Sequence, residues 1–302
     1  MFALTFLRRL ESDLLFLDGA MGSMLLSYGV HEGSCLEALN LTDPDLVRTI
    51  HRAYIDSGVD IIETNTFGGN KARLALYGLE GKVREINLRG IELAREAAAN
   101  DNIFVAASIG PTGRFFREPL KEADFPETFE IFAEQISICL EGGIDLFVIE
   151  TMIDVGEMRT AISAVRSLTD LPVVALMTYQ DSECTALGVT PEGVTSTLEM
   201  LDIEVIGANC GADPAHLLGA LRRMKKEGGK KLAFQPGAGI PSIQEGRAVY
   251  QVSPALLARY ALQAVQEGVS LIGGCCGTTP DHMRAMIEAV RGRGRGSGVG
   301  GQ

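Results

Sequence analysis

Cysteine, positive charge and long apolar runs are all scarce in this chain of 302 residues. Six cysteines are too few for a disulfide scaffold in a chain of this length, so free thiols or a metal site in a reducing compartment are expected. Lysine and arginine total 27 against 39 aspartates and glutamates, and the net charge of -12 would repel the phosphates of nucleic acid. No apolar stretch approaches the roughly 18 residues that span a membrane. We therefore predict a cytoplasmic protein with no nucleic-acid or membrane partner.

The two ends of the chain differ in what they predict. The opening MFALTFLRRLESD places its arginines after the apolar patch, whereas a signal peptide begins with positive charge, so we expect a short leading helix. Residues 291–302 are rich in glycine and arginine and offer nothing to bury, which predicts a disordered tail. Residues 1–290 contain no linker rich in proline and glycine, so we expect them to form one domain.

A repeated strand and helix pattern fills that domain. Apolar runs of strand length recur, each followed by a segment with helical spacing, and many of these helices begin with proline just after a capping residue. The predicted strands are residues 14–18, 59–65, 103–109, 145–151, 172–179, 204–210, 231–236 and 270–276. Their nearly continuous apolar character indicates a parallel sheet that is covered on both faces. Eight such units predict a single (β/α)8 TIM barrel, with a doubly wound sheet as the alternative because periodicity does not show closure.

Active sites of such barrels lie at the carboxyl ends of the strands, and two of these ends carry cysteines. Cys210 ends one run, and the vicinal pair Cys275 and Cys276 ends the last. Three soft thiolates suit zinc, and three protein ligands leave open the fourth tetrahedral position that a catalytic site uses. Because consecutive strand residues point to opposite faces, the pair can share one ion only where the backbone turns, which the neighbouring glycines permit. Two packing thiols at a strand end remain the alternative.

Other strand ends carry acids and amides, namely Asp18, Glu63, Glu150 and Asn209. An aspartate before glycine is common in turns, and either glutamate could form a structural ion pair inside the rim, so a purely structural role stays open for each of these acids.

The remaining candidates for chemistry are weak. The histidines, at positions 31, 51, 216 and 282, fall in a loop or in predicted outer helices and are expected at the surface. Cys139 lies within a predicted amphipathic helix and is expected in the core. No nucleophile elbow, histidine metal motif or phosphate loop occurs, which disfavours hydrolases.

The motifs around the cysteines resemble one family. GANCG around Cys210 together with GGCCGTTP around Cys275 and Cys276 is similar to the homocysteine S-methyltransferase family. The segments LDGAMGSML, VDIIETNTFGGN, SIGPTG and VIETMID are similar to it as well, and the resemblance is strongest to the homocysteine-binding module of cobalamin-dependent methionine synthases. It implies a zinc-dependent enzyme that methylates homocysteine to methionine, with the three cysteines as metal ligands and catalytic residues and with the homocysteine sulfur completing the metal shell.

The same resemblance implies a substrate-binding set. The ammonium group of homocysteine would lie near Asp18 and Glu150, Asn209 would belong to the same site, and the backbone of the next five residues would face the substrate carboxylate. Carboxylates complement an ammonium group, and clustered backbone N–H groups complement a carboxylate. Those five residues are Gly19, Ala20, Met21, Gly22 and Ser23.

Two positions depart from the family pattern, and the methyl donor stays open. Gly237 stands where an asparagine is expected, which removes a polar contact to the substrate or the metal shell, while Ser23 replaces a threonine and keeps the hydroxyl. Because the folate and cobalamin domains of the full synthases are missing, we expect methyl-cobalamin or methyl-folate on a separate corrinoid-carrying or folate-binding protein. Alternatives are a small onium donor such as S-methylmethionine or betaine, or a homocysteine- and zinc-binding subunit that has no activity of its own.

Overall fold

The chain folds into a single (β/α)8 barrel. The computed structural model describes residues 2–99, 101–113, 121, 124–180, 184–211, 213–244 and 247–293. Eight parallel strands form one sheet in the order β1-β10-β7-β6-β5-β4-β3-β2; seven lie within predicted strands, and β4 runs one residue past the predicted range 145–151. They are β1 (Leu15–Phe16), β2 (Ile61–Glu63), β3 (Phe104–Ile109), β4 (Leu146–Met152), β5 (Val173–Met177), β6 (Val205–Cys210), β7 (Lys231–Pro236) and β10 (Leu271–Ile272).

The barrel closes between β1 and β2, the two ends of that strand order. Asp60, just before β2, donates its backbone N–H to the carbonyl oxygen of Phe16 at 2.8 Å. Its carboxylate accepts the N–H of the same Phe16 at 3.0 Å. The Asp60 side chain thus supplies one of the hydrogen bonds that a longer pair of strands would make through the backbone. The closed barrel rules out the alternative of a doubly wound sheet.

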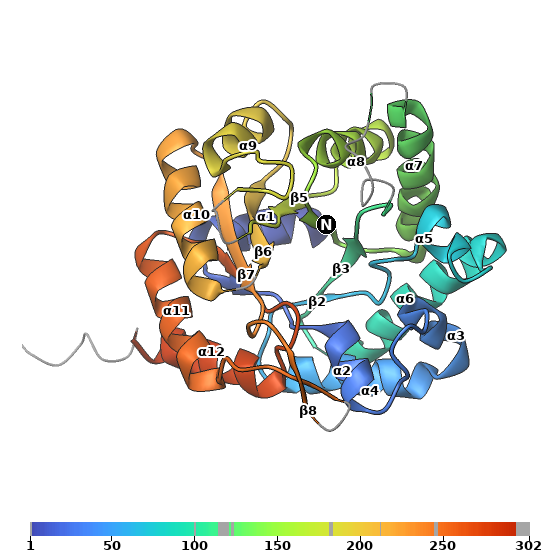
Figure 1. Cartoon of the computed structure of the whole chain (residues 1–302), viewed down its shortest axis with the longest axis horizontal. Coiled ribbons are helices and arrows are strands. Elements are labelled where there is room, and N and C mark those ends of the chain that lie inside the picture. Colours follow the sequence, from blue (N-terminus) through green and yellow to red (C-terminus); the bar gives the residue numbers. More distant parts are fainter. Residues whose placement is uncertain are drawn as a thin grey trace, which may run out of the picture.

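Helices surround the strands (Figure 1). Six of them, α4, α7, α9, α10, α11 and α12, begin with proline at their first or second position, as the start signals predicted. Among the described residues, no helix has both the length and the apolar character needed to cross a membrane. The outer helices are α2 (Met21–Ser27), α3 (Leu39–Thr42), α4 (Pro44–Asp56), α5 (Lys71–Ala75), α6 (Val83–Ala98), α7 (Phe125–Gly142), α8 (Val155–Leu168), α9 (Pro191–Leu198), α10 (Pro214–Glu227), α11 (Pro254–Gln266) and α12 (Pro280–Arg293).

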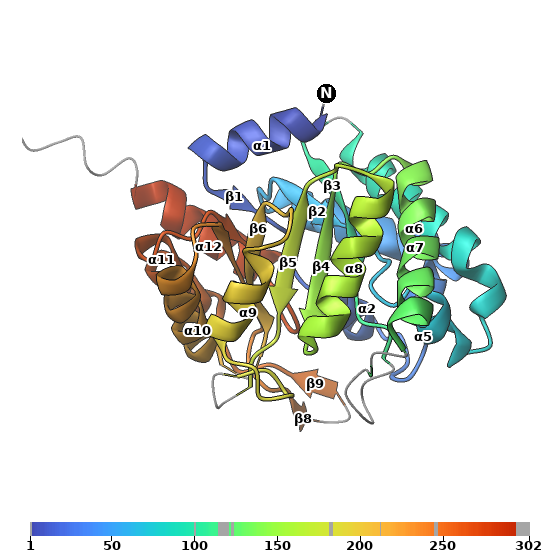
Figure 2. The ribbon, with the colours of Figure 1, turned by 90° about the horizontal axis from the view of Figure 1, so that it is seen from above.

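The leading helix α1 (Phe2–Ser12) covers the amino end of the barrel. Phe6 and Leu10 are buried and pack into the inner core with strand residues, and the Phe6 ring meets the edge of Phe104 at 5.6 Å between centroids. Figure 2 shows α1 across this end and the hairpin of β8 (Ser242–Gln244) and β9 (Arg247–Val249) at the opposite end. The sequence did not predict this hairpin. Since α1 closes the amino end, the carboxyl end is the open mouth.

The last helix runs past the predicted boundary of the domain. Residues 291–293, expected in the tail, belong to α12. The reason is an anchor: the Arg291 guanidinium donates to Asp60 at 3.1 Å and lies over the Phe16 ring. The rest of the predicted tail, residues 294–302, lies outside the described residues.

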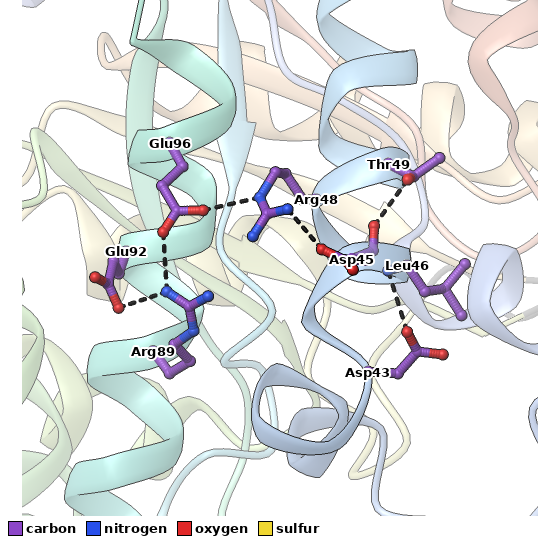
Figure 3. A network of polar contacts seen from close by, with 8 residues as sticks. All are labelled: Asp43, Asp45, Leu46, Arg48, Thr49, Arg89, Glu92 and Glu96. Atoms are coloured by element: carbon purple, nitrogen blue, oxygen red, sulfur yellow. Dashed lines mark hydrogen bonds and ion pairs between the residues drawn. The ribbon is translucent and has the colours of Figure 1, made fainter.

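Salt bridges on the outer surface join α4 to α6 (Figure 3). Arg48 on α4 binds Asp45 at 2.7 Å and reaches Glu96 on α6 at 2.8 Å. Glu96 also accepts from Arg89 at 2.9 Å, and Arg89 pairs with Glu92 at 2.6 Å. These side chains are substantially solvent-exposed, and pairs of this kind contribute only about 0 to 1 kcal/mol each, so the helices are held mainly by apolar packing.

Two of the histidines expected at the surface are buried. His51 has no exposed surface, because it shares the inner face of α4 with Val47, Ile50 and Tyr54. His282 on α12 is 8% exposed and bonds Thr279 and the Val252 carbonyl oxygen through its two ring nitrogens. The helices were predicted correctly, but the pattern did not show which face each imidazole takes.

His51 should make the stability of the protein depend on pH. Neither ring nitrogen has a partner, and burial lowers the pKa of His51 to about 4. The neutral form is the one that folds, so its stabilising contribution is full above the ordinary pKa of about 6.5 and is lost as pH falls toward 4. Between pH 7.5 and pH 5, the free energy of unfolding should fall by about 2 kcal/mol more in the native protein than in a His51→Leu variant, measured by urea denaturation. An equal fall in both would contradict this assignment, and the exposed His31→Leu variant serves as the control.

Candidate active site

A cavity of about 480 Å³ opens at the carboxyl end of the barrel. Most of the predicted site residues line it: Gly19, Ala20, Met21, Gly22, Ser23, Glu150, Cys275 and Cys276. Glu63, a strand-end acid that was not part of the predicted substrate set, lines it as well. Asp18, Asn209 and Cys210 are hydrogen-bonded to this group rather than forming the cavity surface. The strand-end rule therefore brings all of the predicted site residues to one place.

The three predicted cysteine ligands converge. The Sγ atoms of Cys210, Cys275 and Cys276 all lie within 4.8 Å of one another, and those of Cys210 and Cys276 are 3.7 Å apart. Tetrahedral zinc with Zn–S bonds of about 2.3 Å would separate its sulfur ligands by about 3.8 Å. All three cysteines are free, and the spacing and the softness of the donors both fit zinc. Cys139 is buried in α7, as expected of a core residue.

Tight turns bring the sulfurs together. Cys210 ends β6 with φ at 60°, and Gly211 follows with φ at 76°. Cys275 and Cys276 lie beyond β10, where the N–H of Thr278 donates to the Cys275 carbonyl oxygen at 3.0 Å and Gly277 has φ at 79°. This is the turn that the glycines were predicted to permit. A side chain at Gly277 would also meet the Tyr250 ring at 2.2 Å, so both the conformation and the space require glycine.

The three thiols shift one another's pKa values. Hydrogen bonds from Cys210 and Cys275 lower the pKa of Cys276 to about 3. The complementary bonds raise the pKa of Cys275 well above its ordinary value. The interactions within the three-cysteine cluster (the triad) thus favour ionisation of Cys276 over ionisation of Cys275, and a bound cation would favour loss of the remaining thiol protons.

Three buried carboxyl groups lie beside the triad. Asp18, Glu63 and Glu150 are at most 8% exposed, and among the described residues no lysine or arginine pairs with them. Burial raises the pKa of all three, those of Asp18 and Glu63 well above the ordinary range, and the charge of Glu150 adds to the rise in these two. The cavity thus favours a cationic ligand, which would let the carboxyl groups ionise.

Asn209 connects the carboxyl groups to the triad. Its side-chain nitrogen donates to Glu150 at 3.2 Å and to the Thr151 hydroxyl at 2.7 Å, and it lies 3.7 Å from the sulfur of Cys275. The backbone N–H of Thr151 donates in return to Oδ1, the side-chain amide oxygen of Asn209, at 2.9 Å. The sequence did not predict that Thr151 belongs to the site. Its φ of 59° is rare for a β-branched residue, and this backbone conformation has no signal in the sequence.

The segment after β1 is held against the cysteine turn. Ala20 donates its N–H to the Thr278 hydroxyl at 3.2 Å, and the Tyr54 hydroxyl lies 3.0 Å from the Ala20 carbonyl oxygen. The Ser23 hydroxyl accepts the Gly277 N–H at 3.0 Å, so this hydroxyl supports the turn. Ala20 precedes α2 without a side-chain cap, which leaves the first N–H groups of α2 for other acceptors.

Gly237 lies directly against the triad. Its N–H donates to the Cys210 carbonyl oxygen at 3.4 Å, and a Cβ atom there would stand 3.2 Å from the Cys276 carbonyl oxygen. The asparagine expected at this position would therefore have been adjacent to the predicted metal ligands. Because residue 237 is glycine, it offers no polar side chain to the three cysteines.

The fold and the site define a (β/α)8 barrel with three cysteine thiols at its mouth that could hold a metal ion. The chain belongs to the homocysteine S-methyltransferase family, whose profile matches residues 15–290. It is 33% identical over 290 residues to methionine synthase of Mycobacterium leprae (strain TN), covering 90% of this chain and 24% of that protein. Methionine synthase of Mycobacterium tuberculosis is 32% identical over the same length. The chain thus spans about a quarter of these relatives.

Solved structures show the same fold. The homocysteine methyltransferase MmuM from Escherichia coli in its metallated form superposes with a TM-score of 0.80 at 24% identity, covering 96% of this chain and 99% of that one. Its oxidised form gives a TM-score of 0.77 at 25% identity, with the same coverage. The barrel architecture is therefore shared over almost the whole of both chains.

Proposed function

We propose that this barrel transfers a methyl group to the thiol of homocysteine, forming methionine, with zinc held by Cys210, Cys275 and Cys276. The observation that carries the proposal is the convergence of three thiols within 4.8 Å of one another beside a cavity with three buried carboxyl groups that have no ion-pair partner among the described residues. Family membership adds support, since the matching profile covers residues 15–290. A soft metal site and an acidic pocket together suit a substrate that carries both a thiol and an ammonium group.

Metal and protein would have separate tasks. Bound zinc would keep the substrate sulfur as thiolate, the nucleophilic form, and completing that ionisation from a pKa of about 8.5 contributes only about 2 kcal/mol near neutral pH. The larger contribution, about 7 to 11 kcal/mol, would come from orientation of the reacting pair. Asp18 and Glu150 would hold the ammonium end of homocysteine, and the N–H groups of the segment from Gly19 to Ser23 would hold its carboxylate. With both ends fixed, the sulfur can face the triad.

The donor that we propose is methyl-cobalamin or methyl-folate carried by a corrinoid-carrying or folate-binding protein. Arg73 supports an anionic donor, because it lines the cavity and its guanidinium has no ion-pair partner among the described residues. Guanidinium groups bind the phosphate of a corrinoid or the carboxylates of a folate, and they repel an onium ion.

A donor screen tests the proposal. The protein loaded with zinc, together with homocysteine, should form methionine from methyl-cobalamin or methyl-tetrahydrofolate, and at least about tenfold more slowly from S-methylmethionine or betaine, as measured by mass spectrometry. Faster turnover with an onium donor would reverse the assignment of the donor. Homocysteine binding in calorimetry without turnover from any donor would instead indicate a binding subunit.

A further inference from the structure

One buried tyrosine lies between the segment after β1 and the cysteine turn, residues 275–278. Tyr54 belongs to α4 and has no exposed surface. Its hydroxyl group lies 3.0 Å from the carbonyl oxygen of Ala20 and 3.0 Å from the carbonyl oxygen of Thr278, two residues that are 258 positions apart in the chain. A phenolic hydroxyl has one proton to donate, so Tyr54 shares it between the two carbonyl oxygens. A side chain of an outer helix thus connects two parts of the candidate site.

Thr278 makes a second connection between the same two segments. Its hydroxyl group donates to the Cys275 carbonyl oxygen at 2.7 Å and accepts the N–H of Ala20 at 3.2 Å. Just before the cysteine turn, Gly274 donates its N–H to the Asp18 carbonyl oxygen at 2.9 Å. Hydrogen bonds from the backbone and from Thr278 therefore join the two segments in addition to the Tyr54 hydroxyl group.

The two segments approach each other too closely for an extra carbon atom. A Cβ atom added at Gly19 would lie 2.7 Å from Oγ1 of Thr278 and 2.8 Å from the hydroxyl oxygen of Tyr54. A Cβ atom added at Gly274 would lie 2.4 Å from Oγ1 of Thr278. The two hydroxyl groups thus fill the space between the segments, and close-packed groups of this kind transmit a displacement from one segment to the other.

The two segments have different tasks in the proposed function. The cysteine turn would hold zinc through Cys275 and Cys276, and the segment from Gly19 to Ser23 would bind the carboxylate of the substrate. Zinc would fix the turn, and a ligand that binds an already ordered segment loses less conformational entropy. We propose that Tyr54 is a positioning residue that couples zinc binding to binding of the carboxylate end of the substrate. This inference rests on the proposed function.

The coupling is measured with a probe that has no sulfur. L-norvaline has a methyl group where homocysteine has its thiol, so it keeps the amino and carboxylate groups and its side chain offers zinc no ligand atom. Native protein, kept reduced, is titrated with L-norvaline by calorimetry in its metal-free and its zinc-loaded form. Zinc should raise the affinity for L-norvaline by at least about fivefold, although the two ligands share no bond.

Two variants each remove one of the connecting hydroxyl groups. Tyr54→Phe keeps the buried ring, and Thr278→Val keeps the volume of the side chain. In each variant the effect of zinc on the affinity for L-norvaline should fall below about twofold, so the test does not depend on the folding of a single variant. A merely structural role of Tyr54 would weaken L-norvaline binding equally with and without zinc and would leave the ratio of the two affinities unchanged.

Tyr179→Phe is the matched control. Tyr179 is also buried, at 1% exposed, and its hydroxyl group bonds Sδ of Met224 on α10 at 3.8 Å. This variant should keep the full effect of zinc. A smaller than fivefold effect in the native protein, an unchanged effect in Tyr54→Phe and Thr278→Val, or no L-norvaline binding by zinc-loaded protein that binds homocysteine would overturn the inference alone. Failure of the zinc-loaded native protein to bind homocysteine would overturn the proposed function with it.

Discussion

Replacing Cys210, Cys275 or Cys276 by alanine is expected to abolish both zinc retention and methyl transfer. Two remaining thiolates and no nearby fourth protein ligand would leave the ion weakly held, because the three sulfurs are the metal donors that the described residues bring together. Zinc per chain, measured by plasma emission spectrometry after dialysis, should fall from one to below about one tenth in each variant. Methionine formation should fall below detection in the same samples.

Cys139→Ala separates the loss of a metal ligand from the loss of a thiol. Cys139 is fully buried in the core of α7, so its replacement should lower the free energy of unfolding by about 1 kcal/mol and leave zinc content unchanged. Retention of one zinc per chain in all three triad variants would refute the site.

Gly277→Ala is expected to have the second largest effect. The residue has φ at 79°, and a Cβ atom would meet the Tyr250 ring at 2.2 Å. A side chain must therefore either move the ring or undo the turn that places Cys275 and Cys276. Left-handed backbone alone costs an alanine about 1 to 2 kcal/mol, and the overlap adds to this. We expect zinc affinity to fall by at least about tenfold, measured by competition with a chelating dye.

Gly143 provides the matched control for this prediction. It has φ at 78°, but a Cβ atom at this position would meet nothing within 4 Å among the described residues, because Gly143 follows α7 at the surface. Gly143→Ala should show the cost of the backbone conformation in urea unfolding and keep its full affinity for zinc. If Gly277→Ala behaves in the same way, then the contact with Tyr250 does not hold the cysteine turn in place.

Much of the fold follows from local pattern. Each predicted strand coincides with an observed one to within one residue at its carboxyl end or contains it, since a strand buried on both faces needs a continuous apolar run. Proline after a capping residue marks helix starts independently of tertiary contacts. Burial within helices was predicted less well. His51 faces inward and His282 caps the start of its helix, because the packing partners of α4 and α12 come from distant parts of the chain.

The candidate site was also predicted only in part. The cysteines and the acids stand at strand ends in the sequence, and barrel geometry brings strand ends together. Gln235 carried no such mark, since a glutamine inside an apolar run does not reveal that it reaches Glu63 across 172 positions in the chain. Thr151 and the hairpin of β8 and β9 were also missed, because backbone strain and a short polar hairpin leave little trace in composition.

The sequence by itself determined the eight strand and helix units, the three thiols and the acids at the strand ends, because periodicity and motif spacing are local properties of the chain. Only the tertiary structure decided that the barrel closes through Asp60 and Phe16, that Gly277 is packed under Tyr250, and that Gln235 reaches Glu63. Each of these features depends on contacts between residues that are far apart in the chain and that form only when the barrel closes. Local sequence patterns do not encode such contacts.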